Sequence, residues 1–347
     1  MMDKPKVKKK WLHTLVGATL SLTIVVWLLS RVDLDIFRGH LQSFSFGAVL
    51  FSSILILMSL PLRTLQWKLL LGDSIDTRTR DVFRAICFGH LANIALPMRG
   101  GEIVKAGILK RHSPLTLERI VTSMVLCRLQ DLLPVCLLFL FFLTQLSSSD
   151  LSPLIGEEAA ESLSRGIVSY TYEILVAQWP IILALTIGIA LGYAFVRRHA
   201  ASNDESWLGM ATSWLRRRIK RVYDSVRYAR RPITFTLSMC MAILCWVLFV
   251  GSSVPLLMST GQEFFDAIYV ALLITGATTF FQLIPSAPTA IGTFHLGCTF
   301  ALTWAIPSIT EEAALAFAVV LHAVGALTPA LPGLLLLVIP RASENTT

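Results

Sequence analysis

The chain has 347 residues, of which 54% are hydrophobic and 15% charged, and its mean hydropathy is +0.67. Soluble domains average about 25% charged residues, so this composition excludes an ordinary soluble protein. The net charge of +8 does not indicate nucleic-acid binding, because the basic residues gather beside apolar runs, where anionic lipid headgroups neutralise them.

The N-terminal segment is basic and precedes the first long apolar run. Lysines 4, 6, 8, 9 and 10 come before a predicted span at 12–30. This run is too long for a signal peptide and lacks a small-residue cleavage site, so we expect a retained helix. The sequence therefore divides into a basic cytoplasmic N-terminus at 1–11, one membrane domain at 12–340 and a short tail at 341–347.

Further apolar runs of roughly 20 residues predict more spans, since a hydrocarbon core of about 30 Å needs that length. They lie at 46–71, 120–144, 174–196, 233–258, 264–284 and 312–339. Counting 285–306 as a span gives about eight spans and a cytoplasmic C-terminus, whereas counting it as re-entrant gives seven and the opposite side. The predicted fold is an all-α, polytopic membrane helical bundle.

Charge asymmetry between the loops predicts the orientation. The loop at 197–232 is rich in arginine, whereas 145–173 holds five acids and one arginine. The positive-inside rule therefore places the N-terminus and the basic loop in the cytoplasm. Aromatic and basic residues alternate within 207–228, which favours a helix in the membrane interface over a solvated linker.

A broken apolar segment between Asn93 and Arg111 is the strongest candidate for a site. The run reaches Pro97, breaks at Gly100 and Gly101, and resumes as a short helix. Two short arms with basic residues at both mouths predict a re-entrant hairpin; the alternative is a helix lying on the cytoplasmic surface.

A second break resembles the first, and it carries Pro285, Pro288 and Gly292. Paired interruptions in the two halves of a membrane protein indicate a binding site between them, with the prolines and glycines as hinges. His295 and His322 are the deep histidines of this half. Each could have a proton-linked role or be simply hydrogen-bonded.

Three charged residues flank the first break at helical spacing: Arg99, Glu102 and Lys105. Two bases and one acid leave a positive surplus, which suits a phosphate headgroup at a helix start; the alternative is an internal ion pair that fixes the hairpin. Asn93 could cross-bond the hairpin or touch a ligand.

The remaining intramembrane charges lie on two predicted spans. Arg128 and Asp131 are three residues apart and are expected to pair, facing the bundle. Arg63 precedes Trp67 by four residues, a spacing that predicts a cation–π contact.

The sequence lacks the short motifs of metalloproteases, serine hydrolases and nucleotide-binding enzymes, and no cofactor or metal site is predicted. A lipid or lipid-linked-glycan translocase is the first hypothesis. The alternatives are a membrane-bound transferase or accessory subunit of envelope-lipid synthesis, and a non-transporting scaffold for a partner synthase.

The motifs together resemble the flippase-like family, which is the membrane module of lysylphosphatidylglycerol synthases. The resemblance spans about residues 10 to 340. Its fairly specific part is N-x-x-L-P-x-R-x-G-E-x-x-K at 93–105; the weaker parts are Arg63 with Trp67, Arg128 with Asp131, and P-x-x-P-x-x-x-G at 285–292.

The resemblance implies movement of lipids between leaflets in a bacterial inner membrane, with a synthase partner or a homodimer as further possibilities. Lys105 stands where arginine is usual, and Cys127 and His295 stand where the family often has glutamate. Fewer acids favour an anionic lipid over a cationic aminoacyl lipid. The chain does not contain the soluble aminoacyl transferase domain, so it is not expected to make lysyl-lipids alone.

Overall fold

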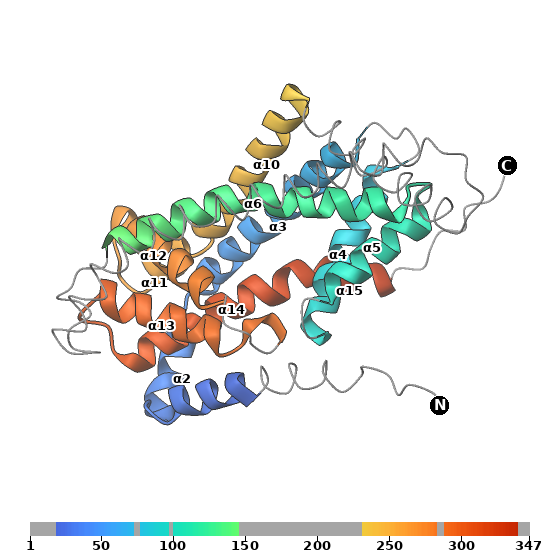
Figure 1. Ribbon diagram of the computed structural model, residues 1–347. Coiled ribbons are helices and arrows are strands. Elements are labelled where there is room, and N and C mark those ends of the chain that lie inside the picture. Colours follow the sequence, from blue (N-terminus) through green and yellow to red (C-terminus); the bar gives the residue numbers. More distant parts are fainter. Residues whose placement is uncertain (1–18, 73–76, 97–99, 146–230, 283–287, 339–347) are drawn as a thin grey trace, which may run out of the picture.

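The computed structural model describes residues 19–72, 77–96, 100–145, 231–282 and 288–338. All regular structure in these ranges is helical, so the all-α prediction is confirmed (Figure 1). Several predicted features lie outside the described residues: the basic N-terminus, the span at 174–196, the interfacial helix at 207–228 and the C-terminal tail.

Five helical segments among the described residues are long and apolar enough to cross a membrane. They are α3 (Phe46–Leu71), α6 (Leu117–Gln145), α10 (Pro232–Gly251) with α11 (Val254–Ser259), α12 (Phe264–Phe281), and α14 (Glu311–Leu327) with η2 (Thr328–Ala330) and α15 (Leu331–Val338). These bounds lie close to the predicted ones. The total of about eight spans stays a prediction, because the first predicted span is described only from residue 19.

Exposed leucines on α6 show why these helices need a lipid environment. Leu129, Leu132, Leu133 and Leu137 are 47–58% exposed and follow helical spacing along one face. A continuous apolar face of this kind is costly in water and favourable against acyl chains. The structure therefore supports a multi-pass membrane protein.

One short helix, α2 (Leu34–Ser43), was not predicted. Its start is fixed by Asp33, whose side-chain Oδ1 accepts hydrogen bonds from the amides of Asp35 at 2.8 Å and Ile36 at 3.2 Å. An acidic residue suits a helix N-terminus on both hydrogen-bonding and dipole grounds. The helix packs against α14.

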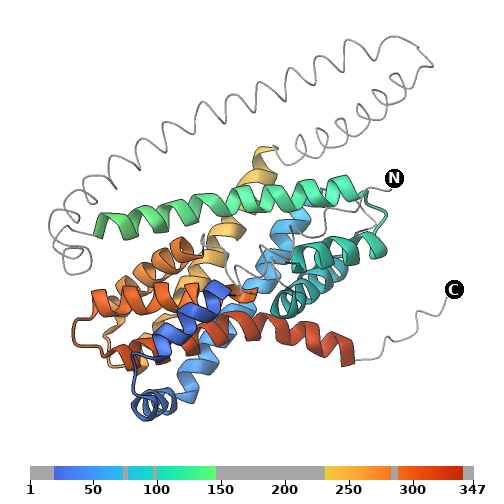
Figure 2. The ribbon, with the colours of Figure 1, turned by 60° about the horizontal axis from the view of Figure 1, so that its bottom comes forward.

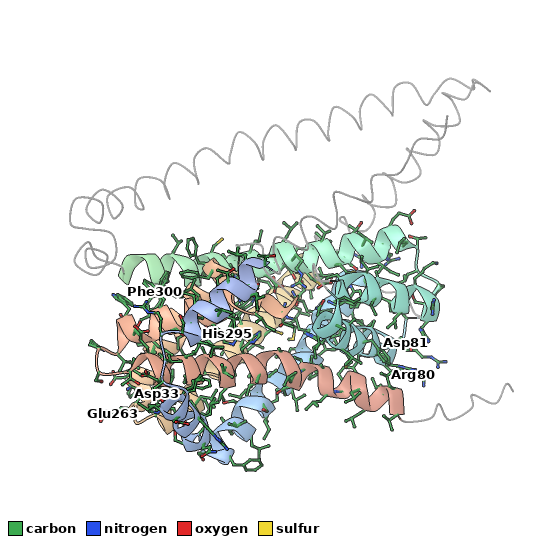
Figure 3. The ribbon with its side chains drawn as sticks, turned by 90° about the horizontal axis from the view of Figure 1, so that it is seen from below. Asp33, Arg80, Asp81, Glu263, His295 and Phe300 are labelled. Atoms are coloured by element: carbon green, nitrogen blue, oxygen red, sulfur yellow. The ribbon has the colours of Figure 1, made fainter. Side chains whose placement is uncertain are left out.

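The two ends of the bundle differ in charge. Figure 3 places Arg80 and Asp81 at one end, and Asp33 and Glu263 at the other. The first, here called the basic end, is where the ends of four helices meet through Lys68 with Thr79, Lys110 with Leu115 and Arg119 with Leu71. Near these helix ends the sequence has Lys68, Arg78, Arg80, Arg84, Lys110, Arg111 and Arg119 against Asp81 and Glu118. The second, the acidic end, is where Asp33 contacts Glu312 and Arg31 contacts Glu311. Near these contacts and the start of α12 the sequence has Asp33, Asp35, Glu263, Asp266, Glu311 and Glu312 against Arg31 and Arg38.

Two helical hairpins enter the bundle from these opposite ends (Figures 1 and 2). The first pairs α4 (Thr79–Ala95) with α5 (Gly101–His112), and both its mouths lie at the basic end. The second pairs α12 with α13 (Thr293–Ala305) and opens at the acidic end, where α14 begins. The helices end and resume close to the predicted breaks, and a re-entrant position in the membrane stays a prediction. Pro97 and Pro285 lie outside the described residues.

The last helical segment runs from the acidic end back toward the basic end, so α15 lies beside α4 (Figure 1). Gly333 permits this contact, because a Cβ built there would lie 2.6 Å from the carbonyl oxygen of Cys87. Small residues commonly allow such close approach of helices in membranes.

Glycine also sets the spacing between α4 and α5. A Cβ built on Gly101 would overlap the carbonyl oxygen of Gly89 and the side chain of Asn93. By contrast, a Cβ on Gly107, six residues along the same helix, meets nothing within 4 Å. Close packing of the first hairpin therefore depends on Gly101.

We expect Gly101→Ala to destabilise the protein, because overpacking of this kind costs about 1–3 kcal/mol. Gly107→Ala should leave stability unchanged or slightly raised, since alanine favours helix. Thermal unfolding of both variants in detergent checks the difference. Equal unfolding temperatures for the two variants would contradict the packing role of Gly101.

Candidate functional site

A cavity of about 180 Å³ lies where α3, α4, α5 and α6 meet. We call it the charged cavity, because five of its lining residues are Asp, Glu, Lys or Arg. Its walls comprise Arg63, Gln66, Trp67, Ile86, Gly89, His90, Asn93, Glu102, Lys105, Met124, Cys127, Arg128 and Asp131.

The five charges form one alternating chain. Lys105 Nζ lies 3.1 Å from Glu102 Oε2, and Glu102 Oε1 accepts a hydrogen bond from Arg128 Nη2. Arg128 Nη1 lies 3.6 Å from Asp131 Oδ2. Arg63 Nη1 completes the chain by donating to Asp131 Oδ1. Base and acid therefore alternate from α5 through α6 to α3.

This arrangement leaves one positive charge in excess, since three bases face two acids. Asp131 is the most buried member, with its side chain 9% exposed, whereas the Arg128 side chain is 55% exposed. Each acid bridges two bases, and such pairing is what makes buried charges tolerable. Arg128 lies at the centre of the chain and contacts both acids.

Neutral side chains hold the charged ones in place. Gln66 accepts a hydrogen bond from Arg63 at 3.0 Å and donates to Gln130 at 3.2 Å, and Gln130 donates to Ser238 at 2.7 Å. On the other side, Trp246 Nε1 donates to Asp131 Oδ1 at 3.4 Å. These contacts fasten α10 to the charge chain.

The predicted cation–π contact between Arg63 and Trp67 is wrong. The ammonium of Lys105 lies 5.7 Å from the Trp67 ring centroid, and the Trp67 indole donates to Ser123 at 2.9 Å. The guanidinium of Arg63 is held by Asp131 instead, because a carboxylate is a stronger partner for a guanidinium than an aromatic ring is.

Asn93 cross-bonds the two arms of the first hairpin. Its Oδ1 accepts a hydrogen bond from the amide of Gly101 at 2.8 Å, and Asn93 also lines the charged cavity. Gly100 precedes the start of α5 as its N-cap residue. Arg99 lies outside the described residues.

The structure thus joins groups that the sequence analysis treated separately. The pair on α6, the acid and base on α5, Arg63 and Asn93 all line one cavity. His90, Gln130 and Trp246 were missed as members of the site. The spacing of His90, three residues before Asn93 on α4, is the sequence signal that could have indicated a shared helix face.

The two histidines of the second half lie elsewhere, beside the second break. Their ring centroids are 4.8 Å apart, and His322 Nε2 lies 2.9 Å from the carbonyl oxygen of Thr289. His295 Nδ1 accepts from the amide of Gly292 at 3.3 Å. Figure 3 labels His295, which marks the position of the second break in the bundle. A proton-linked role for either histidine stays a prediction.

The backbone at the second break has an uncommon conformation. Thr289 and Ala290 have positive φ angles of 58° and 61°, which L-residues seldom adopt. Gly292, at φ 91°, approaches the short apolar helix at Thr19–Leu29 so closely that a Cβ would lie 2.9 Å from the carbonyl oxygen of Ser21. Pro288 begins the short helix η1 (Pro288–Ala290).

Comparison with known proteins gives one result. Searches of curated proteins and of solved structures found no significant match. The sequence does match the family described as the lysylphosphatidylglycerol synthase TM region, over residues 14–333. This match covers nearly the whole chain and agrees with the resemblance noted in the sequence. The chain belongs to the lysylphosphatidylglycerol synthase transmembrane-region family.

Proposed function

We propose that the protein translocates an anionic lipid, or a lipid-linked glycan, by binding its phosphate in the charged cavity. The observation that carries this proposal is the single positive charge left over in the chain from Lys105 to Arg63. A phosphodiester brings one negative charge and so neutralises the cavity. Arg128 is the natural contact, because it is the most exposed of the three bases.

Family membership supports a role in lipid metabolism or transport. The two hairpins suit transport in particular, since broken helices that meet near the middle of a membrane are common at the substrate sites of transporters. In this proposal the first hairpin gives the headgroup access from the basic end, and the second from the acidic end.

We also propose that the protein lies in a bacterial inner membrane with its N-terminus and basic end in the cytoplasm. The excess of lysine and arginine at the basic end supports this orientation through the positive-inside rule.

Single cysteines test the orientation. In a cysteine-free background, Arg111→Cys at the basic end should react with a membrane-impermeant maleimide in inside-out vesicles. Glu263→Cys at the acidic end should react in right-side-out vesicles. The reverse pattern would overturn the orientation.

Replacing Arg128 by glutamine tests the phosphate site. The change leaves Lys105 with Glu102 and Arg63 with Asp131, so both acids keep a base and the fold should persist. The cavity loses its surplus charge, and retention of an anionic lipid should fall about 10- to 100-fold, as expected for a charged hydrogen bond. Native mass spectrometry measures retention, and dithionite quenching of a fluorescent lipid in proteoliposomes measures transport.

Arg111→Gln is the matched control, because it removes the same charge from an exposed position at the basic end. Normal lipid retention and transport by Arg128→Gln, at unfolding temperatures equal to the control, would sink the headgroup proposal. That result would favour the scaffold hypothesis, in which the charges only hold helices together.

A second pair of variants tests the ion pair between Arg63 and Asp131, which lies at the buried end of the row of charges. Asp131→Asn removes the acid that holds Arg63, and leaving this partly buried cation without its acid costs up to about 3–5 kcal/mol. The unfolding temperature should therefore drop markedly. Arg63→Gln combined with Asp131→Asn should recover most of the loss and keep lipid retention, since Lys105, Glu102 and Arg128 still leave one positive charge. A double variant no more stable than Asp131→Asn would refute the pairing.

A further inference from the structure

A second cavity, of about 220 Å³, adjoins the charged one. The two share His90 and Asn93, so α4 forms the wall between them. None of the described residues that line the second cavity is Asp, Glu, Lys or Arg. Its polar groups are mainly hydroxyls, and we call it the hydroxyl-lined cavity.

Four of the hydroxyls come from the segment between the end of α10 and α12, and three of these are arranged as acceptors. Ser252, Thr275 and Thr278 donate their protons to carbonyl oxygens one turn back on their own helices, at 2.7, 2.7 and 2.8 Å. Their oxygen lone pairs remain available to the cavity. A ligand that fits these groups must supply hydrogen-bond donors.

His322 adds another acceptor. Its Nε2 lies 2.9 Å from the carbonyl oxygen of Thr289, and because a carbonyl can only accept, Nε2 must carry the proton. The neutral ring then has an acceptor at Nδ1. This ring is stacked on Phe294, with centroids 4.9 Å apart, so an imidazole and an apolar ring face lie together at the cavity wall.

His90 lies between the two cavities, and its ring nitrogens are available for hydrogen bonds to a ligand. Within the described part of the chain, its ring has no hydrogen bond, although it lines both cavities. A polar side chain so placed can contact a ligand that extends from one cavity into the other.

Charge and size narrow the class of ligand. A cation is disfavoured, since the hydroxyl-lined cavity offers no described acid and its neighbour carries a surplus positive charge. An engineered cavity of about 150 Å³ holds benzene, so a volume of this order accepts a six-membered ring. A neutral ring bearing several hydroxyls has the required donors.

We propose that the hydroxyl-lined cavity is a second subsite, which takes a neutral polyol ring attached to the lipid phosphate. The ring is a sugar or an inositol, and its phosphodiester lies in the charged cavity beside His90 and Asn93. This inference rests on the proposed function, because it assumes that the charged cavity binds the phosphate.

Two lipids of equal charge test the subsite. Phosphatidylinositol and phosphatidylmethanol, with matched acyl chains, both carry one negative phosphodiester, but only the first has ring hydroxyls. Native mass spectrometry of the full chain, supplied with both and with phosphatidylcholine, should show about fivefold preference for phosphatidylinositol over phosphatidylmethanol.

Two neighbouring threonines on α12 provide variant and control. Thr278 lines the hydroxyl-lined cavity, whereas Thr279 does not, and both donate to a carbonyl oxygen four residues back. Thr278→Val should reduce the preference at least twofold, and Thr279→Val should leave it unchanged. Ser253→Ala, which also removes a hydroxyl from the cavity lining, is a second test should Thr278→Val fail to fold.

The outcomes separate this inference from the proposed function. Equal retention of the two anionic lipids, both above phosphatidylcholine, would overturn the polyol subsite and leave phosphate binding intact. An unchanged preference in Thr278→Val and Ser253→Ala would overturn it likewise. Retention of neither anionic lipid above phosphatidylcholine would overturn the proposed function and the subsite together.

Discussion

The cost of placing charge inside a membrane shapes the whole first half of this protein. Arg63, Glu102, Lys105, Arg128 and Asp131 lie on helices that otherwise face lipid or one another, and each would be expensive alone. Their alternation neutralises all but one charge. Because the partners come from α3, α5 and α6, the same contacts that solve the electrostatic problem also fix how these helices meet.

Close packing makes that solution possible. Glu102 and Lys105 reach the cavity only because α5 lies against α4, and this contact depends on Gly89 and Gly101 having no side chains in the way. Asn93 then holds the arms together through the Gly101 amide. The second hairpin brings threonine side chains to the far side of α4, where they join two serines from between α10 and α11 and His322 of α14. Polar groups from both halves of the protein thus lie on either side of α4.

Local features of the structure could be predicted from the sequence, but long-range partners could not. The bounds of α3 and α6 follow from apolar length, the breaks follow from proline and glycine, and the contact between Arg128 and Asp131 follows from helical spacing. The pairing of Arg63 with Asp131 joins residues 68 positions apart. Spans that are apolar all round give no periodicity to reveal which faces meet.

The same limit explains the errors around the site. The cation that lies over Trp67 is Lys105 and not Arg63, because the partner of the indole ring depends on how α5 is placed against α3. His90 was overlooked although its spacing to Asn93 indicates a shared helix face, because that spacing does not show what the face packs against. Helix α2 was missed because it is short, and only its acidic N-cap marks it in the sequence.

The separation of Arg63 from Asp131 has a consequence for biogenesis. Ribosomes add roughly 5–20 residues per second, so α3 emerges several seconds before the aspartate that will neutralise its arginine. During that interval Arg63 has to stay near water or the insertion machinery, and α3 can settle at full depth only together with α6. Full insertion of α3 therefore depends on a helix that is synthesised after it.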